Sequence, residues 1–123
     1  MKQVLLVFIG GGLGSALRFL LSKALNPYFQ HFFLGTFLVN ITGCLLIGII
    51  LGLSAKNNLL TENYTLLLAT GFCGGFTTFS TFAFEKHTLL KSGELLPLTI
   101  YLVSSIVIGV ITIALGLWIA KLL

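Results

Sequence analysis

Four long apolar stretches, each containing few polar residues, run along the chain. They cover residues 3–25, 33–55, 64–90 and 98–121 to within a few positions. A helix needs about 20 mostly apolar residues to cross the hydrocarbon core of a bilayer, so each stretch is long enough. An aromatic-rich stretch, 28–33, which includes His31, joins the first two apolar stretches, and the polar stretch 56–63 joins the second to the third. This pattern predicts an all-α membrane protein in which residues 1–123 form a single four-helix transmembrane domain.

The third apolar stretch has an unusual middle. Gly74 and Gly75 precede a run of hydroxyl-bearing and aromatic residues that ends at Phe82. Gly, Thr, Ser and Phe are weak helix formers, so we expect this helix to be broken near residues 74–79. Broken backbone at membrane depth is tolerated only where protein or a water-filled cavity satisfies its polar groups.

The composition excludes a soluble domain and several classes of site. Charged residues make up 8% of the chain and hydrophobic residues 57%, whereas a soluble domain carries about 25% charged residues. The basic residues are scattered singly, which argues against nucleic acid as a partner. Cys44 and Cys73 have no CxxC spacing, so buried small residues explain them better than a metal site. No A-x-A-like cleavage site follows the first apolar stretch, so we expect a retained helix.

The lysines are balanced between the two sides of the membrane that four spans define. One side holds Lys2, Lys56 and Lys121, and the other holds Lys23, Lys86 and Lys91. An excess of Lys and Arg on one side normally decides orientation, and here there is none. We therefore expect the chain to insert in both orientations and to pair as an antiparallel, dual-topology homodimer, which would form an inverted repeat from one gene product.

The polar residues inside the spans are almost all hydrogen-bond donors. The candidates among them, all of which can donate hydrogen bonds, are Arg18, Asn40, Thr42, Thr77, Thr78, Ser80, Thr81, Tyr101 and Ser105. The three glutamates, Glu62, Glu85 and Glu94, are expected at or beyond the ends of the spans. Polar residues inside a membrane usually face the interior of the helix bundle. A path with many donors and no carboxylate suits a small anion.

Two phenylalanines follow the expected break. Phe79 and Phe82 are three residues apart and therefore share a helix face. A phenyl ring has a positive edge, which can replace part of the hydration shell of an anion. Each of these residues also has a commoner role. Phe at this spacing usually packs against other helices, and a buried Asn such as Asn40 usually forms hydrogen bonds between helices. Arg18 can extend to the lipid headgroups. Their joint occurrence favours the anion path.

Three other functions are less consistent with the sequence. A small multidrug transporter of the four-helix, dual-topology kind needs a carboxylate in its first helix, and this one has none. A membrane enzyme such as a lipid kinase needs a carboxylate cluster, which three scattered glutamates do not supply. A purely structural subunit would not need polar residues in the middle of its spans.

Three motifs resemble those of the Fluc family of fluoride channels, also called CrcB. They are GGLGSALRF at 11–19, GTFLVNITG at 35–43 and GFCGGFTTFSTF at 71–82, and the resemblance extends along the whole chain. The family pattern often has Ala at the position of Ser15. The resemblance implies a passive fluoride channel, with no enzymatic activity, that exports fluoride across the inner (plasma) membrane of a bacterium and protects the cell from fluoride toxicity.

The resemblance also implies roles for particular residues. Phe79 and Phe82 would line one of two antiparallel pores, and Asn40 would donate its amide to fluoride. Ser80 and Thr81 would form a polar track, with Tyr101 and Ser105 facing it from the fourth helix. Gly109 stands where some members have a further serine, and Arg18 and Glu85 would lie in a vestibule. The carbonyl groups of Gly74 and Thr77 would hold a structural sodium ion at the dimer interface.

Overall fold

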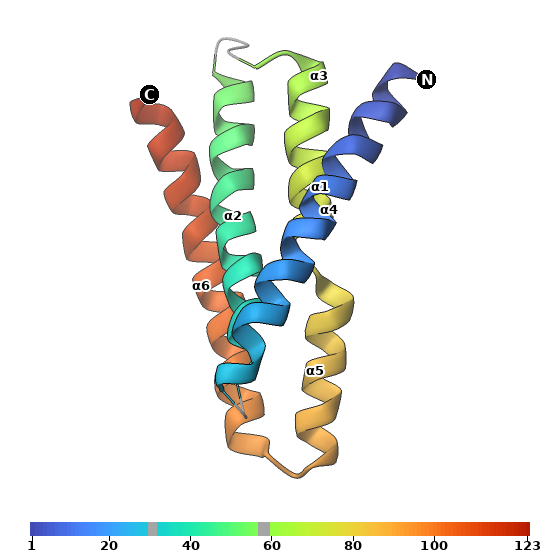
Figure 1. Ribbon diagram of the computed structural model, residues 1–123. Coiled ribbons are helices and arrows are strands. Elements are labelled where there is room, and N and C mark those ends of the chain that lie inside the picture. The colour runs from blue at the N-terminus through green and yellow to red at the C-terminus, as the bar shows by residue number, and fades with distance from the viewer. Residues whose placement is uncertain (30–31, 57–59) are drawn as a thin grey trace.

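The four spans predicted from hydropathy are present in a computed structural model that describes residues 1–29, 32–56 and 60–123 (Figure 1). The first is α1 (Lys2–Leu25), which the short helix η1 (Asn26–Tyr28) extends, and the second is α2 (Leu34–Ala55). The third span, Glu62–Lys91, consists of α3 (Glu62–Thr65), the π-helical η2 (Leu66–Cys73), α4 (Gly74–Phe76) and α5 (Phe79–Lys91). The fourth is α6 (Leu95–Leu122). The described residues contain no strand, and His31 and residues 57–59 of the expected polar loop lie outside them.

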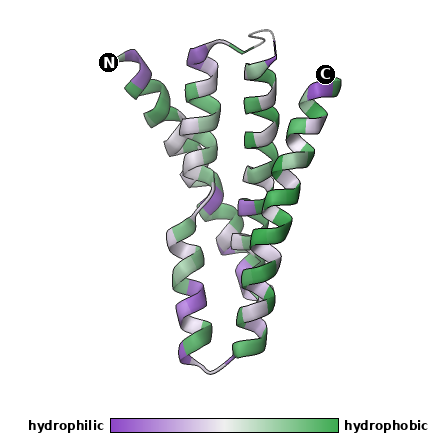
Figure 2. Ribbon diagram, turned by 180° about the vertical axis from the view of Figure 1, so that it is seen from behind, coloured by the Kyte–Doolittle hydropathy of each residue, from purple (hydrophilic) through white to green (hydrophobic). Residues whose placement is uncertain are grey.

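Both termini lie at the same end of the molecule as the last turn of α2 and the first turn of α3 (Figure 1). The last turn of α1, the first turn of α2 and the turn from α5 to α6 lie at the other end. Most large apolar side chains are exposed on the outside of the helices, and Figure 2 shows this apolar colouring along most of the length of the spans. An apolar exterior of this kind is stable in lipid and not in water.

Glycines allow the helices to approach one another closely. A Cβ atom at Gly48 of α2 would lie 2.5 Å from the carbonyl oxygen of Ile113, and one at Gly116 of α6 would lie 2.5 Å from that of Leu45. The α1 helix meets the third span in the same way through Gly10 and Gly14. Since lipid provides no hydrophobic drive between helices, this close contact is a main source of helix association.

The third span is interrupted at Thr77 and Thr78, whose backbones are extended (φ −80°, ψ 158° and φ −148°, ψ 120°). Both residues fall inside the range 74–79 expected from the sequence. Gly74 and Gly75, which looked like the break itself, are helical and belong to α4. The interruption therefore follows the glycines and is made by the two threonines.

The second half of the third span carries two buried charged residues. Glu85 and Lys86 were expected at the charged end of this span, in a helical extension, and both lie inside α5. Their burial was not expected: their exposed fractions are 4% and 9%. The helix ends at Lys91, and Gly93 takes a positive φ of 76° in the turn that follows. The end of α5 lies within one residue of the limit of 90 expected from the sequence.

Candidate functional site

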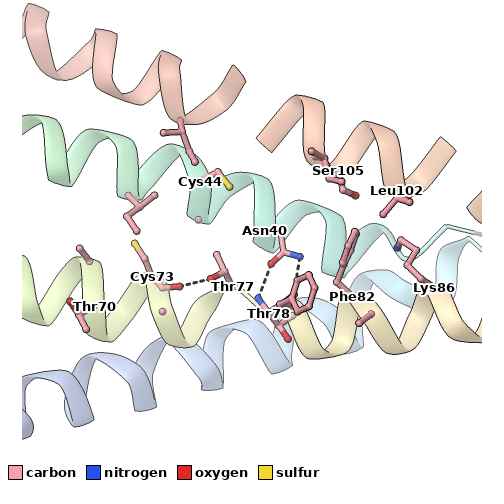
Figure 3. A pocket seen from close by; sticks show the side chains of 18 residues that line it. Asn40, Cys44, Thr70, Cys73, Thr77, Thr78, Phe82, Lys86, Leu102 and Ser105 are labelled. Carbon is pink, nitrogen blue, oxygen red and sulfur yellow. Dashed lines mark hydrogen bonds between the residues drawn. The ribbon is translucent and has the colours of Figure 1, made fainter. Parts of the chain in front are cut away.

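A groove of about 760 Å³ lies between α2, the third span and α6, beside the interruption (Figure 3). Its walls are mostly apolar. Its polar lining residues are Asn40, Thr70, Thr77, Thr78, Lys86 and Ser105. No Asp or Glu is among the described residues that line it. The groove therefore combines an apolar wall with several hydrogen-bond donors and one cation, which suits a small anion.

Asn40 holds the interruption in place from α2. Its Oδ1 accepts a hydrogen bond from the backbone N–H of Thr78 at 2.8 Å, and its Nδ2 donates to the carbonyl oxygen of Thr78 at 3.2 Å. Both polar groups of the extended Thr78 residue are thus satisfied by one side chain (Figure 3). An amide Nδ2 carries two N–H groups, so one donor of Asn40 is still available to an ion in the groove.

Hydroxyl groups cluster where α5 begins. The Thr78 hydroxyl oxygen caps the helix by accepting a hydrogen bond from the N–H of Thr81 at 3.2 Å, as Thr does at many helix N-termini. The Thr78 hydroxyl also lies 3.1 Å from that of Thr81 and 3.4 Å from that of Ser80. Ser80 and Thr81 do not line the groove themselves, but their hydroxyls adjoin Thr78, which does.

Phe79 and Phe82 both line the groove, so the shared face predicted for them is confirmed. Their ring centroids are 6.2 Å apart with the planes tilted by 40°. Phe79 is 81% exposed in the single chain. Phe82 also meets Tyr101 edge to face, with centroids 5.6 Å apart.

Tyr101 and Glu85 form a buried polar cluster with Thr36. The Tyr101 hydroxyl donates to Oε2 of Glu85 at 2.8 Å, and the Thr36 hydroxyl donates to Oε1. Tyr101 and Thr36 are 0% exposed. Thr36 was not among the residues expected from the sequence, although it lies four residues before Asn40 and hence on the same face of α2.

Ser105 adds a donor to the groove from α6. Its hydroxyl oxygen is buried and has no hydrogen-bond partner among the described residues. Most buried polar atoms in proteins are paired, so an unpaired hydroxyl in a groove wall is a group available to a ligand. Gly109, one helical turn later, supplies no polar side chain. A Cβ atom built on Gly109 would lie 3.6 Å from the Cys44 sulfur.

Arg18 lies on the other side of the third span, against α4. Its Nε donates to the carbonyl oxygen of Gly75 at 3.0 Å, and the Ser15 hydroxyl donates to the same oxygen at 3.3 Å. Because α4 ends at Phe76, its last carbonyl groups have no helical partners, and α1 satisfies one of them. Neither Arg18 nor Glu85 lines the groove, and a vestibule role for the two residues stays a prediction.

The interruption also frees the two carbonyl groups expected to hold sodium. In a continuous helix the Gly74 carbonyl would accept from the N–H of Thr78, but that N–H donates to Asn40. The Thr77 carbonyl would accept from the N–H of Thr81, which donates to the Thr78 hydroxyl. Unwound carbonyls of this kind coordinate sodium in transporters. The described residues contain no group of His, Cys, Asp or Glu side chains that could hold a metal ion, and a sodium ion at the two carbonyl groups stays a prediction.

The comparisons with known proteins agree on one family. A family model described as CrcB-like protein, Camphor Resistance (CrcB), matches residues 5–117. A relative from Azobacteroides pseudotrichonymphae named fluoride-specific ion channel FluC is 46% identical over 117 residues, which cover 94% of each chain. Relatives with the same name from Prosthecochloris aestuarii and Phocaeicola vulgatus are 47% and 44% identical, over 98% of this chain in both cases and over 94% and 100% of their own lengths. The chain belongs to the CrcB family.

Proposed function

We propose that the protein is a fluoride-selective channel through which fluoride leaves the cell passively, so that it protects the cell from fluoride toxicity. The observation that supports this most directly is the groove beside the interrupted helix. It brings Asn40, Phe79, Phe82 and Ser105 together without any carboxylate among its described lining residues. The names of the relatives, which are 44–47% identical over nearly the whole chain, identify fluoride as the anion. The protein is not an enzyme.

Fluoride crosses by exchanging its water shell for many weak donors. The free N–H of Asn40, the Ser105 hydroxyl and the positive ring edges of Phe79 and Phe82 provide such donors in the groove. Ser80 and Thr81 continue the polar surface along α5. Binding in a channel must be favourable enough for entry and weak enough for release, and neutral donors meet both needs.

The channel is an antiparallel homodimer of two chains inserted in opposite orientations. The groove is open on one side in the single chain, and a second chain would cover it and the exposed ring of Phe79. Lys86 lies inside α5, so the two ends carry three lysines (Lys2, Lys56 and Lys121) and two (Lys23 and Lys91). This difference of one is too small to dictate a single orientation.

A sodium ion at the dimer interface holds the two interruptions together. One chain supplies the carbonyl oxygens of Gly74 and Thr77, and Gly74 lies in the groove wall with nothing within 4 Å of its Cβ position. Hard cations prefer several oxygen ligands, so two chains would supply four. The sodium ion is structural, and it anchors the backbone from which Phe79 and Ser80 begin α5.

The function is tested by fluoride efflux from liposomes that contain the purified protein and potassium fluoride, with sodium ions present on both sides of the membrane. In a passive channel fluoride carries net charge outward, so efflux should begin only when a potassium ionophore supplies a compensating current. Protein-free liposomes are the control, and chloride-loaded liposomes test selectivity. Absence of ionophore-dependent fluoride efflux, or chloride efflux at the same rate, would refute the proposal.

Membrane location is tested in cells. The protein should fractionate with the plasma membrane, and its expression should restore growth on fluoride to a bacterial strain that lacks fluoride export. A Phe79→Ile, Phe82→Ile double variant that is present in the membrane at the same level is the matched control. Growth rescue by this variant equal to that of the wild-type chain would contradict the assigned path.

A further inference from the structure

Lys86 carries a charge that the path described above does not use. It lies in the second half of α5 and lines the groove, although only 9% of its surface is exposed. Its ammonium nitrogen has no hydrogen-bond partner among the residues that the structure describes. The side chain reaches the same end of the groove as Phe82 and Ser105 (Figure 3).

Two aromatic rings hold the ammonium group. Its nitrogen lies 3.9 Å from the centroid of the Phe82 ring and 2.8 Å from that of the Tyr101 ring. Such contacts stabilise a cation through the negative ring faces, but they do not occupy its three N–H donors. Lys86 is therefore fixed in position. The Glu85 carboxylate interacts with its charge, but its N–H donors have no hydrogen-bond partner among the described residues.

A second unused donor lies in the same groove. The buried Ser105 hydroxyl also lacks a partner among the described residues. A buried unpaired polar group in a native protein calls for an explanation, and a bound ion is one of the few available. Two unpaired hydrogen-bond donors in one groove, one of them a cation, indicate that the groove binds an anion.

We propose that Lys86 and Ser105 form an anion-binding site at the α5–α6 end of the groove, with Lys86 as its fixed positive charge. The inference rests on the proposed function and adds to it a residue that concentrates fluoride at one end of the path. The cation lies on the face of the Phe82 ring. It therefore draws electron density toward that face and makes the ring edge a better partner for the anion.

The site has a distinct kinetic consequence. A fixed charge strengthens anion binding, so its removal raises the fluoride concentration that gives half-maximal flux. Release also becomes easier, so the maximal rate does not fall in proportion. A lysine that only stabilised the fold would change the amount of active protein and leave the half-saturating concentration unaltered.

The experiment measures initial efflux rate against internal fluoride concentration in liposomes, per unit of protein that elutes as the assembled species. Lys86→Gln and Lys86→Met remove the charge, and Met keeps an unbranched apolar stem against the two rings. Both should raise the half-saturating concentration about tenfold. The Coulomb attraction of a unit charge in contact with an anion near a protein surface strengthens anion binding by at least about this factor. Lys86→Arg should stay close to the wild-type protein.

Lys91→Gln is the matched control, because Lys91 lies on the same helix and is exposed. It removes the same charge and should leave the half-saturating concentration unchanged. An unchanged value in both neutral Lys86 variants would overturn the proposal, and so would their common failure to assemble, which would assign the charge to the fold. If the wild-type protein passes no fluoride, the proposed function itself fails, and that result is distinguishable from either of these.

Discussion

Two glycines of α1 should respond in opposite ways to the same substitution. A Cβ atom at Gly14 would lie 2.2 Å from the carbonyl oxygen of Phe72 and 2.8 Å from the nitrogen of Phe76, whereas one at Gly12 meets nothing within 4 Å. The neighbours of Gly14 are backbone atoms, which cannot rotate away. Gly14→Ala should therefore push α1 away from the third span, and Gly12→Ala should not.

The size of the effect follows from these distances. Non-bonded atoms attract one another best near 3.5 Å, so α1 must move by about 1 Å, and a gap of that size forfeits up to about half of the contact energy along the interface. Overpacking costs about 1–3 kcal/mol, while Ala gains up to about 1 kcal/mol over Gly in a helix. We expect Gly14→Ala to destabilise the protein by about 1–2 kcal/mol, and Gly12→Ala to be neutral or stabilising by up to about 1 kcal/mol.

The displacement should also affect conduction. Ser15 and Arg18 are on the moving helix, and both donate to the Gly75 carbonyl just before the interruption. Loss of these bonds would release the end of α4 and shift the start of α5, where Phe79 lies. Gly14→Ala should therefore reduce fluoride flux even in the fraction of protein that assembles.

The assay heats the detergent-solubilised variants and measures the assembled fraction by size exclusion, followed by fluoride efflux per assembled protein. The midpoint temperature should fall for Gly14→Ala and be equal or higher for Gly12→Ala. Equal losses in the two variants would refute the reasoning, because the contact that distinguishes them would then have no effect.

Further predictions concern the path, the interface and the topology. Phe79→Ile should reduce fluoride efflux strongly because an aliphatic chain has no positive edge, while Phe84→Ile, on an exposed ring of the same helix, should leave it unchanged; equal rates would remove Phe79 from the path. Asn40→Asp should abolish efflux, because it loses the bond to the Thr78 carbonyl and places a negative charge in the groove; wild-type efflux from assembled protein would contradict this. Replacing sodium by a larger cation should weaken the dimer or stop flux, and unaltered flux after exhaustive sodium removal would argue against the site at Gly74. Two lysines added at one terminus should abolish function, and an oppositely biased copy should restore it; normal conduction by one biased variant alone would refute the antiparallel dimer.

Local composition by itself determined the number of spans and the chemistry available to them. Hydropathy is a property of each stretch of sequence and needs no partner, so four apolar stretches predict four helices. Weak helix formers after Gly75 located the interruption to within a few residues. The donor-rich set around Phe79 and Phe82, free of carboxylates, indicated a small anion, and the motifs added fluoride.

The tertiary structure decided which backbone groups lose their helical hydrogen bonds and which polar side chains contact one another. The interruption falls at Thr77 and Thr78 because Asn40, 38 residues away, competes for the Thr78 backbone. The sequence placed Glu85 and Lys86 in a charged extension at the end of the third span, because a charged pair is costly inside a membrane. Their burial depends on Tyr101, a partner from another helix. Bonds between distant residues of this kind leave no periodic signal in the sequence, so only the packed helices could reveal them.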